Sequence, residues 1–311
     1  MKNSRILVTG GAGFIGSNLV KTLLESGNEV VALDNFITGK RENISAFSNC
    51  KNFYFIEGDI RDADLCRKAV DGIDYVLHQA ALGAIPRSIK DPATTTQINI
   101  CGFVNMLHAA KDAGVKRFIY ASSSSVYGDN KTLPKQEHLI GKPLNPYAIT
   151  KYTNELFAEN FYSLYGIETI GLRYFNVFGP RQDPNSAYAA AVPIFIERAL
   201  KNMPITVYGD GDQTRDFIYV KDIVAANAYL AASDECGVFN VAYGGKQTIN
   251  ELVETIIRLT GSSSKVTHAA ERAGDVRHSM ANVAKLAATG FKPSYTFSDG
   301  LAATIEFFKN K

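Results

Sequence analysis

The chain has 311 residues, of which 46% are hydrophobic and 21% charged, so it is long and apolar enough to form one or two globular domains. A formal net charge of +2 argues against a dedicated nucleic-acid-binding surface. Four scattered cysteines without a C-x-x-C pair, and five histidines without metal-ligand spacing, predict free thiols in a cytoplasmic protein and no metal site.

The N-terminus superficially suggests a signal peptide, because Lys2 and Arg5 precede an apolar stretch. A glycine-rich turn interrupts that stretch too early for a signal peptide. No run approaches ~18 apolar residues, so we expect no membrane span.

The first predicted element is a short apolar strand, residues 5–9, which runs directly into a glycine-rich turn, residues 10–16. Apolar residues at helical spacing follow over residues 17–26. Gly11, Gly13 and Gly16 fit G-x-G-x-x-G, and Gly10, Gly13 and Gly16 fit G-x-x-G-x-x-G. Such glycines let the backbone approach a pyrophosphate, which lies on the helix N-terminus. The order of strand, turn and helix therefore predicts a dinucleotide-binding site.

A second strand over residues 29–33 ends in Asp34, which lies 18 residues past Gly16. That spacing is close to the ~20 residues typical of the carboxylate that binds the adenosine ribose. A carboxylate there would repel a 2′-phosphate, so we predict NAD rather than NADP. The alternative is that Asp34 merely begins a loop.

Strand and helix patterns alternate through the first half of the chain. Further strands are predicted at 53–56, 75–80, 117–121 and 168–173, and helices at 62–70, 93–113 and 147–165. This alternation is typical of an α/β protein with a Rossmann-type, doubly wound parallel sheet. Ligands of such sheets bind beyond the carboxyl ends of the strands, where the glycine-rich turn, Asp34, Asp59 and the serines at 122–125 fall.

The pattern changes after about residue 176. A helix is predicted over 192–201 and strands at 206–208, 216–220 and 238–241, with a turn at 209–211. We therefore predict an NAD-binding domain over residues 1–175 and a smaller α/β substrate-binding domain formed mainly by residues 176–311. The strands near 216–220 and 238–241 are candidates to return to the first sheet.

Tyr147 and Lys151 would stack one turn apart on the predicted helix 147–165. A free phenol has a pKa near ~10 and is a poor base, but an adjacent ammonium lowers that pKa. Such a tyrosine can take a proton from a sugar hydroxyl. The spacing alone is weak evidence, and it gains weight from the predicted nucleotide site.

With these motifs in order, the chain resembles the extended short-chain dehydrogenase/reductase family, and most closely its nucleotide-sugar C4-epimerases. The matching segments are residues 9–16, 34–35, 58–59, 78–81, 122–128, 147–151, 173–176 and 215–220. Residues 177–184 and 273–279 resemble the UDP-N-acetylglucosamine 4-epimerases. The resemblance implies NAD-dependent inversion at C4 of a UDP-hexose through a transient 4-keto sugar.

The resemblance makes Tyr147 the catalytic base and acid, with Lys151 lowering its pKa and holding the nicotinamide ribose. Ser123 would bind the oxygen at C4, with Ser124 the next candidate because four consecutive serines leave the register open. NAD contacts are implied for Gly10, Gly13, Phe14, Ile15, Gly16, Asp34, Asn35, Thr38, Gly39, Asp59, Ile60, Gln79, Ala80, Ala81, Asn99, Tyr147, Lys151 and Tyr174. For Asn99 and Tyr120 the alternative is a packing role.

Arginine suits phosphate because its planar fork donates two parallel hydrogen bonds. The resemblance places Asn176, Arg215 and Arg272 on the UDP diphosphate and stacks Tyr208 on uracil, although a core tyrosine is the alternative there. Further substrate contacts are implied for Arg87, Ser88, Ser123, Tyr147, Val192, Asp275 and Ser279.

Ser279 is the clue to sugar specificity. In the family a bulky aromatic residue at this position resembles enzymes restricted to UDP-glucose and UDP-galactose, whereas serine leaves room for a 2-acetamido group. We therefore predict turnover of UDP-GlcNAc/UDP-GalNAc and also of UDP-Glc/UDP-Gal.

Four alternative functions are considered for this chain. One is an epimerase of UDP-glucose alone, and another is a UDP-glucuronate decarboxylase. A 4,6-dehydratase would need an acid pair after the active-site hydroxyl, where this chain has Ser124 and Ser125. A non-catalytic NAD-sensing protein would be expected to lack the Tyr147–Lys151 pair.

Helices near 94–113 and 147–165 resemble the family's dimer-forming bundle, so we expect a homodimer by analogy.

Overall fold

The computed structural model describes residues 2–271 and 277–311 and divides into two compact units. Unit 1 comprises the chain up to Asn130 together with Glu137–Tyr174 and Val224–Phe239. Unit 2 comprises Lys131–Gln136, Phe175–Ile223 and Asn240–Lys311. The predicted boundary at 175/176 lies one residue from the boundary at 174/175, and segments 131–136 and 224–239 fall in the other unit.

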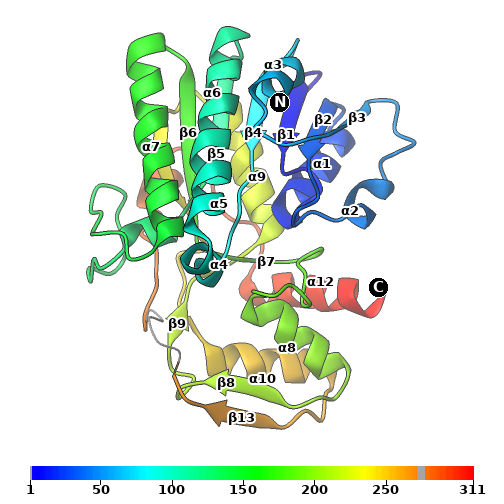
Figure 1. Cartoon of the computed structure of the whole chain (residues 1–311). Helices are drawn as coiled ribbons and strands as arrows, with labels where there is room; N and C mark the ends of the chain where they lie inside the picture. The colour runs from blue at the N-terminus through cyan, green and yellow to red at the C-terminus, as the bar shows by residue number, and fades with distance from the viewer. Residues whose placement is uncertain (1, 272–276) are drawn as a thin grey trace. The chain divides into compact units, whose positions relative to one another are not determined.

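Unit 1 is built on a seven-stranded sheet with the order β11-β6-β5-β4-β1-β2-β3 (Figure 1). Neighbouring strands from β6 to β3 run parallel. The strands are β1 (Arg5–Thr9), β2 (Glu29–Asp34), β3 (Phe53–Glu57), β4 (Tyr75–His78), β5 (Arg117–Ser123), β6 (Glu168–Tyr174) and β11 (Gly237–Val241). The strand order reverses at β1, so the predicted Rossmann-type sheet is confirmed. Sheets of this kind bind ligands at the carboxyl ends of the strands beside the reversal, here β1 and β4.

Helices follow most strands of unit 1, and α6 and α7 stand side by side in Figure 1. The elements are α1 (Phe14–Glu25), α2 (Glu42–Ser45), α3 (Ala63–Ala69), α4 (Ile85–Lys90), α5 (Pro92–Thr96), the π-helical turn η1 (Gln97–Gly102), α6 (Phe103–Asp112), the 3-10 turn η2 (Ser124–Tyr127), α7 (Pro146–Tyr165) and most of α9 (Val220–Ala231). The single helix predicted over 93–113 is therefore wrong in detail. Gly102 lies against Ile60, where a β-carbon would come within 2.6 Å of Cδ1, and π-turns of this kind occur often at functional sites.

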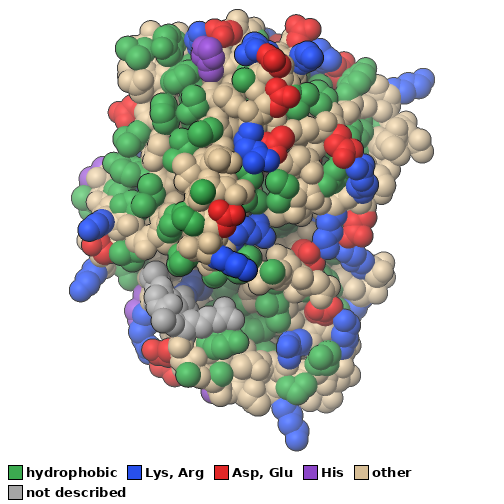
Figure 2. Space-filling view, viewed as in Figure 1, with side chains coloured by type: hydrophobic (Ala, Val, Ile, Leu, Met, Phe, Trp, Pro, Cys, Tyr) green, Lys and Arg blue, Asp and Glu red, His purple; other side chains and the backbone are tan. Residues whose placement is uncertain are grey.

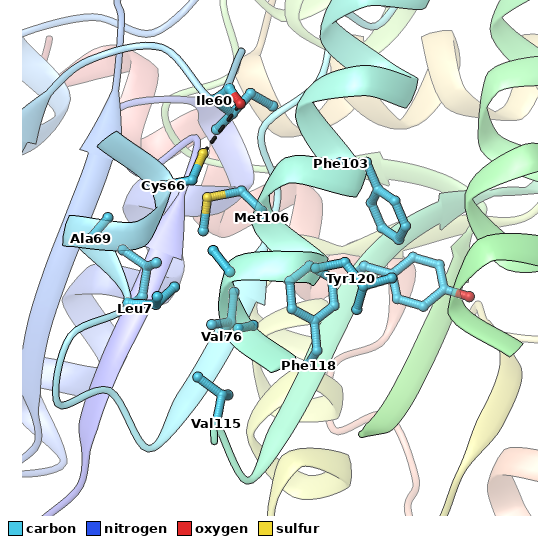
Figure 3. Packing of buried hydrophobic residues seen from close by; sticks show 14 of the residues in the cluster. Leu7, Ile60, Cys66, Ala69, Val76, Phe103, Met106, Val115, Phe118 and Tyr120 are labelled. Atoms are coloured by element: carbon cyan, nitrogen blue, oxygen red, sulfur yellow. Dashed lines mark hydrogen bonds between the residues drawn. The ribbon is translucent and has the colours of Figure 1, made fainter. Parts of the chain in front are cut away.

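The core of unit 1 is a cluster of buried apolar side chains beneath α3 and α6 (Figure 3). Phe103, Phe118 and Tyr120 are fully buried, and the Phe103 ring meets the other two edge to face, with centroids 5.6 and 5.2 Å away. Burying each such side chain contributes about 1.5–3 kcal/mol. The cluster fixes β4 and β5 beneath the site that their carboxyl ends form.

The described residues of unit 2 form three two-stranded sheets, which pair β10 with β7, β12 with β9 and β13 with β8. Its elements are β7 (Asn176–Phe178), α8 (Ala191–Leu200), β8 (Ile205–Tyr208), β9 (Thr214–Arg215), β10 (Phe217–Tyr219), β12 (Gln247–Thr248), α10 (Ile249–Thr260), β13 (Val266–Ala269), α11 (Ala284–Ala288) and α12 (Phe297–Lys309). Of the two strands expected to return to the main sheet, β11 does so. The strand at 216–220 does not, because Phe217 packs in an aromatic cluster of unit 2 with Phe178 and Phe297.

Charged side chains of both signs are interspersed over the face seen in Figure 2. Among the described residues, no helix is long and apolar enough to cross a membrane. The same part of the chain holds no group of three His, Cys, Asp or Glu side chains placed to bind a metal ion.

Candidate active site

The glycine-rich turn between β1 and α1 has backbone contacts that exclude side chains. Gly10 has φ +67°, and a β-carbon there would lie 2.8 Å from the Ala80 backbone nitrogen. A β-carbon on Gly16 would lie 2.0 Å from the Gly10 carbonyl oxygen. Gly13 is the N-cap of α1, with no side-chain cap and no acidic residue in the first turn of the helix. The first turn thus offers backbone N–H groups to an anion, which fits a dinucleotide pyrophosphate.

Asp34 at the end of β2 anchors this turn. Its Oδ2 accepts a 2.9 Å hydrogen bond from the Ala12 backbone N–H, and its Oδ1 accepts a 2.8 Å bond from Phe36. Burial raises the pKa of the carboxyl, although these hydrogen bonds oppose the rise. A β-carbon on Gly39 would come within 2.7 Å of Oδ1, so this close approach requires glycine. The backbone N–H groups of Asn35 and Gly13 also act on this carboxylate, so the chain itself holds Asp34 in place at the end of β2.

The segments that follow β2 and β3 contain further residues predicted to contact NAD. Asn35 donates a 2.7 Å hydrogen bond to Asp59, whose pKa is lowered by its ion pair with Arg61. Thr38 is exposed near Asp34, whereas Ile60 is buried after β3.

The end of β4 is tied to the end of β1. The backbone N–H groups of Gln79 and Ala80 donate to the Thr9 carbonyl and hydroxyl oxygens, at 3.1 and 3.2 Å. The Thr9 hydroxyl also lies 3.0 Å from Nδ1 of His78, whose pKa burial lowers to about 3, so the imidazole is neutral. The Tyr174 hydroxyl donates to Oε1 of Gln79 at 3.2 Å. These bonds fix Ala80 against Gly10.

Asn99, in the π-helical turn η1, connects this loop to α7. Its amide accepts from the Leu82 N–H at 2.7 Å and donates to the Leu82 carbonyl at 3.1 Å. It also donates to the Thr150 hydroxyl at 3.1 Å, which in turn donates to the Tyr147 carbonyl at 2.8 Å. Because Asn99 is 1% exposed and bonded at both ends, the geometry favours a supporting role over direct contact with NAD.

The serines after β5 fall into distinct roles. Ser122 is buried and donates its hydroxyl to Glu155. Ser123 forms a side-chain hydrogen bond with Tyr147 and accepts from the Ser125 hydroxyl at 3.0 Å. Ser123 is therefore the serine that the structure brings to Tyr147, in the register that the resemblance implies. Ser124 begins the 3-10 turn η2.

Lys151 is 3% exposed, and its ammonium donates a 2.7 Å hydrogen bond to the Ala121 carbonyl. Its nitrogen lies 6.0 Å from the centroid of the Tyr147 ring. Burial lowers the pKa of Lys151 to about 8, although the charge of Glu155 opposes this. The expected low pKa of Tyr147 is not what this structure shows. Burial raises that pKa, and the hydrogen bond with Ser123 offsets part of the rise.

The N-terminus of α7, which carries Tyr147, is fixed by capping. Asn145 accepts from the Ala148 N–H at 2.9 Å, and Pro146 occupies the first helical turn. The Ser88 hydroxyl accepts from the Tyr147 N–H at 3.1 Å and donates to the Ile85 carbonyl at 2.8 Å. Ser88 is 1% exposed, and these two bonds hold the N-terminus of α7; its contact with the sugar stays a prediction. Arg87, its neighbour on α4, is half-buried.

Arg173 and Glu155 form a buried ion pair, which no sequence motif predicted. Glu155 also accepts the hydrogen bond from Ser122. Arg173 donates to both carboxylate oxygens of Glu155, at 2.9 and 2.7 Å, and to the Tyr127 hydroxyl at 3.1 Å. Both charged side chains are at most 5% exposed. Glu155 lies four residues after Lys151 on the same face of α7, and this spacing could have indicated that Glu155 is near the site.

In unit 2, predicted substrate residues gather around β7, β9 and the segment that follows residue 276. Asn176 donates to the Asp216 carbonyl at 3.2 Å, and Arg215 donates to the Thr214 carbonyl at 2.9 Å. The Ser279 N–H donates to that same Thr214 carbonyl at 3.1 Å. Residues 176, 215 and 279 are thus linked through three consecutive residues, Thr214 to Asp216.

Tyr208, at the end of β8, is 39% exposed, which favours a stacking surface over the core alternative. Val192 in α8 is 2% exposed, so its side chain packs in the interior of unit 2. Arg272 and Asp275 lie outside the described residues.

Comparison with known proteins is consistent with this geometry. Residues 6–242 match the model of the NAD dependent epimerase/dehydratase family. The UDP-glucose 4-epimerase of Mycolicibacterium smegmatis is 36% identical over 313 residues, covering 99% of each chain. A UDP-N-acetylglucosamine 4-epimerase from Methanobrevibacter ruminantium, solved with UDP-N-acetylmuramic acid, is 43% identical with a TM-score of 0.96, covering 100% of this chain and 99% of its own. The UDP-glucose 4-epimerase of Thermotoga maritima, solved with UDP-glucose, is 37% identical with a TM-score of 0.93, covering 98% and 99%.

Proposed function

This chain belongs to the NAD dependent epimerase/dehydratase family, and from that premise we propose that it inverts C4 of a UDP-hexose. The proposed substrates are UDP-GlcNAc/UDP-GalNAc and also UDP-Glc/UDP-Gal. The observation that supports this most is the Ser123–Tyr147 hydrogen bond beside Lys151, at the sheet edge that carries the glycine-rich turn.

When bound, NAD would supply the hydride acceptor, and then the hydride donor, for C4 of the sugar. Tyr147 accepts the proton of the C4 hydroxyl, and Ser123 donates a hydrogen bond to the same oxygen. Lys151 stabilises the tyrosinate by its charge and offsets the raised pKa of the phenol. After the transient 4-keto sugar has presented its other face, Tyr147 returns the proton. One residue thus serves as base and acid, and the net result is inversion at C4.

A dehydratase is the rival within the family. Elimination of water needs an acid and a base beyond Tyr147, and the two residues after Ser123 are Ser124 and Ser125. The hydroxyl groups of serine do not supply that acid–base chemistry at neutral pH. A UDP-glucuronate decarboxylase and an epimerase restricted to UDP-glucose remain the alternatives, and the choice of substrate separates them.

The diphosphate site is proposed in unit 2. Asn176, Arg215 and Arg272 would hold the phosphates and Tyr208 the uracil. The hydrogen bond from Arg215 to the Thr214 carbonyl supports this, because it orients a guanidinium that can donate further bonds to phosphate oxygens.

The rise of rate with pH should end near pH 8, because Tyr147 must be ionised to act as a base while Lys151 must stay charged. The ammonium of Lys151, with its pKa at about 8, is lost above that pH, and this loss cancels the further ionisation of Tyr147, so kcat/KM should level off as pH rises through about 8. Initial rates of UDP-GlcNAc turnover across the pH range measure this. A rate that continues to rise well above pH 8 would show that the charge of Lys151 is not required.

Enlarging Ser279 should change sugar selectivity. A tyrosine at this position would fill the space proposed for the 2-acetamido group, so Ser279→Tyr should lower kcat/KM for UDP-GlcNAc ~10–100-fold, more than for UDP-galactose. Ser279→Ala, which leaves the space open, is the control and should retain the ratio. Equal losses on both sugars would remove the proposed specificity role.

A homodimer through the helices near 94–113 and 147–165 is also proposed, and α7 covers the second of these segments. Ile149, Leu156, Leu164 and Tyr165 are each about half exposed or more, an unusual apolar surface for a helix in contact with water alone.

A further inference from the structure

Asp216, between β9 and β10, is a fully buried carboxylate whose oxygens are taken up by the chain's own backbone. Its Oδ1 accepts hydrogen bonds from the Tyr243 and Gly244 N–H groups at 3.1 and 3.2 Å. Its Oδ2 accepts from the Ala281 N–H at 3.1 Å. A carboxylate with these partners has no exposed oxygen for substrate, so its effect must pass through the segments that it holds.

Residues 277–281 run parallel to the segment that contains Asp216. The hydrogen bonds between the two segments show that the Asp216 side chain takes the place of a backbone carbonyl. The Thr214 N–H donates to the Arg277 carbonyl at 2.9 Å, and the Ser279 N–H donates to the Thr214 carbonyl at 3.1 Å, as in a parallel ladder. The next rung would join the Ala281 N–H to the Asp216 carbonyl. The carboxylate accepts that bond instead.

The Asp216 carbonyl is thereby released for a different partner. It accepts from both the backbone N–H and the side-chain amide of Asn176, at 3.1 and 3.2 Å. The segment containing Ser279 is held on one side by Thr214 and on the other by the Asp216 side chain. One residue therefore sets the positions of Asn176 and Ser279 at once.

We infer that Asp216 is a positioning residue for substrate binding, which holds the proposed diphosphate ligand Asn176 and the proposed sugar-pocket residue Ser279 in register. The inference rests on the proposed function. It predicts that a change at Asp216 acts on binding of the UDP-sugar rather than on proton transfer, since Tyr147 and Ser123 belong to unit 1.

The test is Asp216→Asn, which keeps the shape of the side chain but turns one acceptor into a donor that faces backbone N–H groups. Loss of one such buried bond should raise KM for UDP-GlcNAc ~10-fold or more, while kcat stays within ~3-fold. Calorimetric titration with UDP alone should show the same loss of affinity. The ratio of UDP-GlcNAc to UDP-glucose turnover should also change.

Asp222→Asn is the matched control. Asp222 is 1% exposed and accepts from the Ser294 and Tyr295 N–H groups at 2.7 and 3.3 Å, away from residues 176 and 279. It should lower the melting temperature as Asp216→Asn does, but leave KM and UDP affinity within ~2-fold. An equal rise of KM in both variants, or a loss confined to kcat in Asp216→Asn, would overturn the inference.

Should Asp216→Asn fail to fold, Asp216→Glu, which keeps the acceptors but displaces them by one methylene, takes its place. Unchanged KM and UDP affinity in that variant would overturn the inference. A wild-type enzyme that binds UDP but inverts neither sugar would contradict the proposed function, and UDP titration of the variants would still decide the role of Asp216.

Discussion

Replacing Tyr147 with phenylalanine should lower kcat ~10²–10⁴-fold, the range that a general acid–base group contributes. The substitution removes the hydroxyl that bonds to Ser123 but keeps the ring beside Lys151. Bound NAD and the melting temperature should remain close to those of the wild type, because phenylalanine keeps the ring and the glycine-rich turn proposed to hold the pyrophosphate does not involve this hydroxyl. Steady-state turnover of UDP-GlcNAc, with the nucleotide content of the purified protein, gives both quantities.

Tyr162→Phe is the matched control, since Tyr162 lies on the same helix and is 47% exposed. It should leave kcat within ~2-fold, as surface substitutions generally do. A Tyr147→Phe enzyme that retained more than a tenth of the wild-type kcat would assign the proton transfer to another group.

Gly16→Ala should abolish stable retention of NAD. The added β-carbon would lie 2.0 Å from the Gly10 carbonyl oxygen and 2.7 Å from the Gly10 carbonyl carbon. Both contacts are with backbone, so the turn itself must shift, and NAD affinity should fall ~10–100-fold. Nucleotide released from the purified protein, quantified by chromatography, measures the effect.

Lys21→Ala is the comparison, because Lys21 lies on the same helix with its side chain 51% exposed and paired with Glu25 at the helix surface. Its NAD content should equal that of the wild type. Full NAD occupancy in Gly16→Ala would show that the pyrophosphate does not lie on this turn.

The parts of the fold that the sequence predicted well are those where local signals agree. The strand, glycine-rich turn and helix around residues 5–25 combine an apolar run, a breaker and helical periodicity. Helix α7 begins at an Asn145-Pro146 cap and ends at Gly166, so its bounds could be predicted within a residue.

Signals of the same kind were present but unused in the last third of the chain. Helix α10 begins with a capping box formed by Thr248 and Glu251, and α12 begins with one formed by Thr296 and Asp299. Neither helix was predicted, although an S/T-x-x-E/D pattern before apolar residues marks such starts.

Other features depend on tertiary contacts that no local pattern encodes. The π-turn at 97–102 ends at Gly102, which packs against Ile60, a residue far away in sequence. The pairing of β10 with β7 rather than with the main sheet follows from aromatic packing within unit 2. The roles of Ser88 and Asp216 required the positions of backbone N–H groups from other segments.

Incubation with UDP-GlcNAc in D₂O, followed by proton NMR, tests whether C4 is inverted by removal and return of the same hydrogen. We expect UDP-GalNAc to accumulate with protium retained at C4, because the hydrogen removed from that carbon is returned to it without exchange with solvent. The same experiment with UDP-glucose should yield UDP-galactose. Deuterium at C4 of the product, or no inversion of either sugar by protein that carries NAD, would contradict C4 epimerisation by this route.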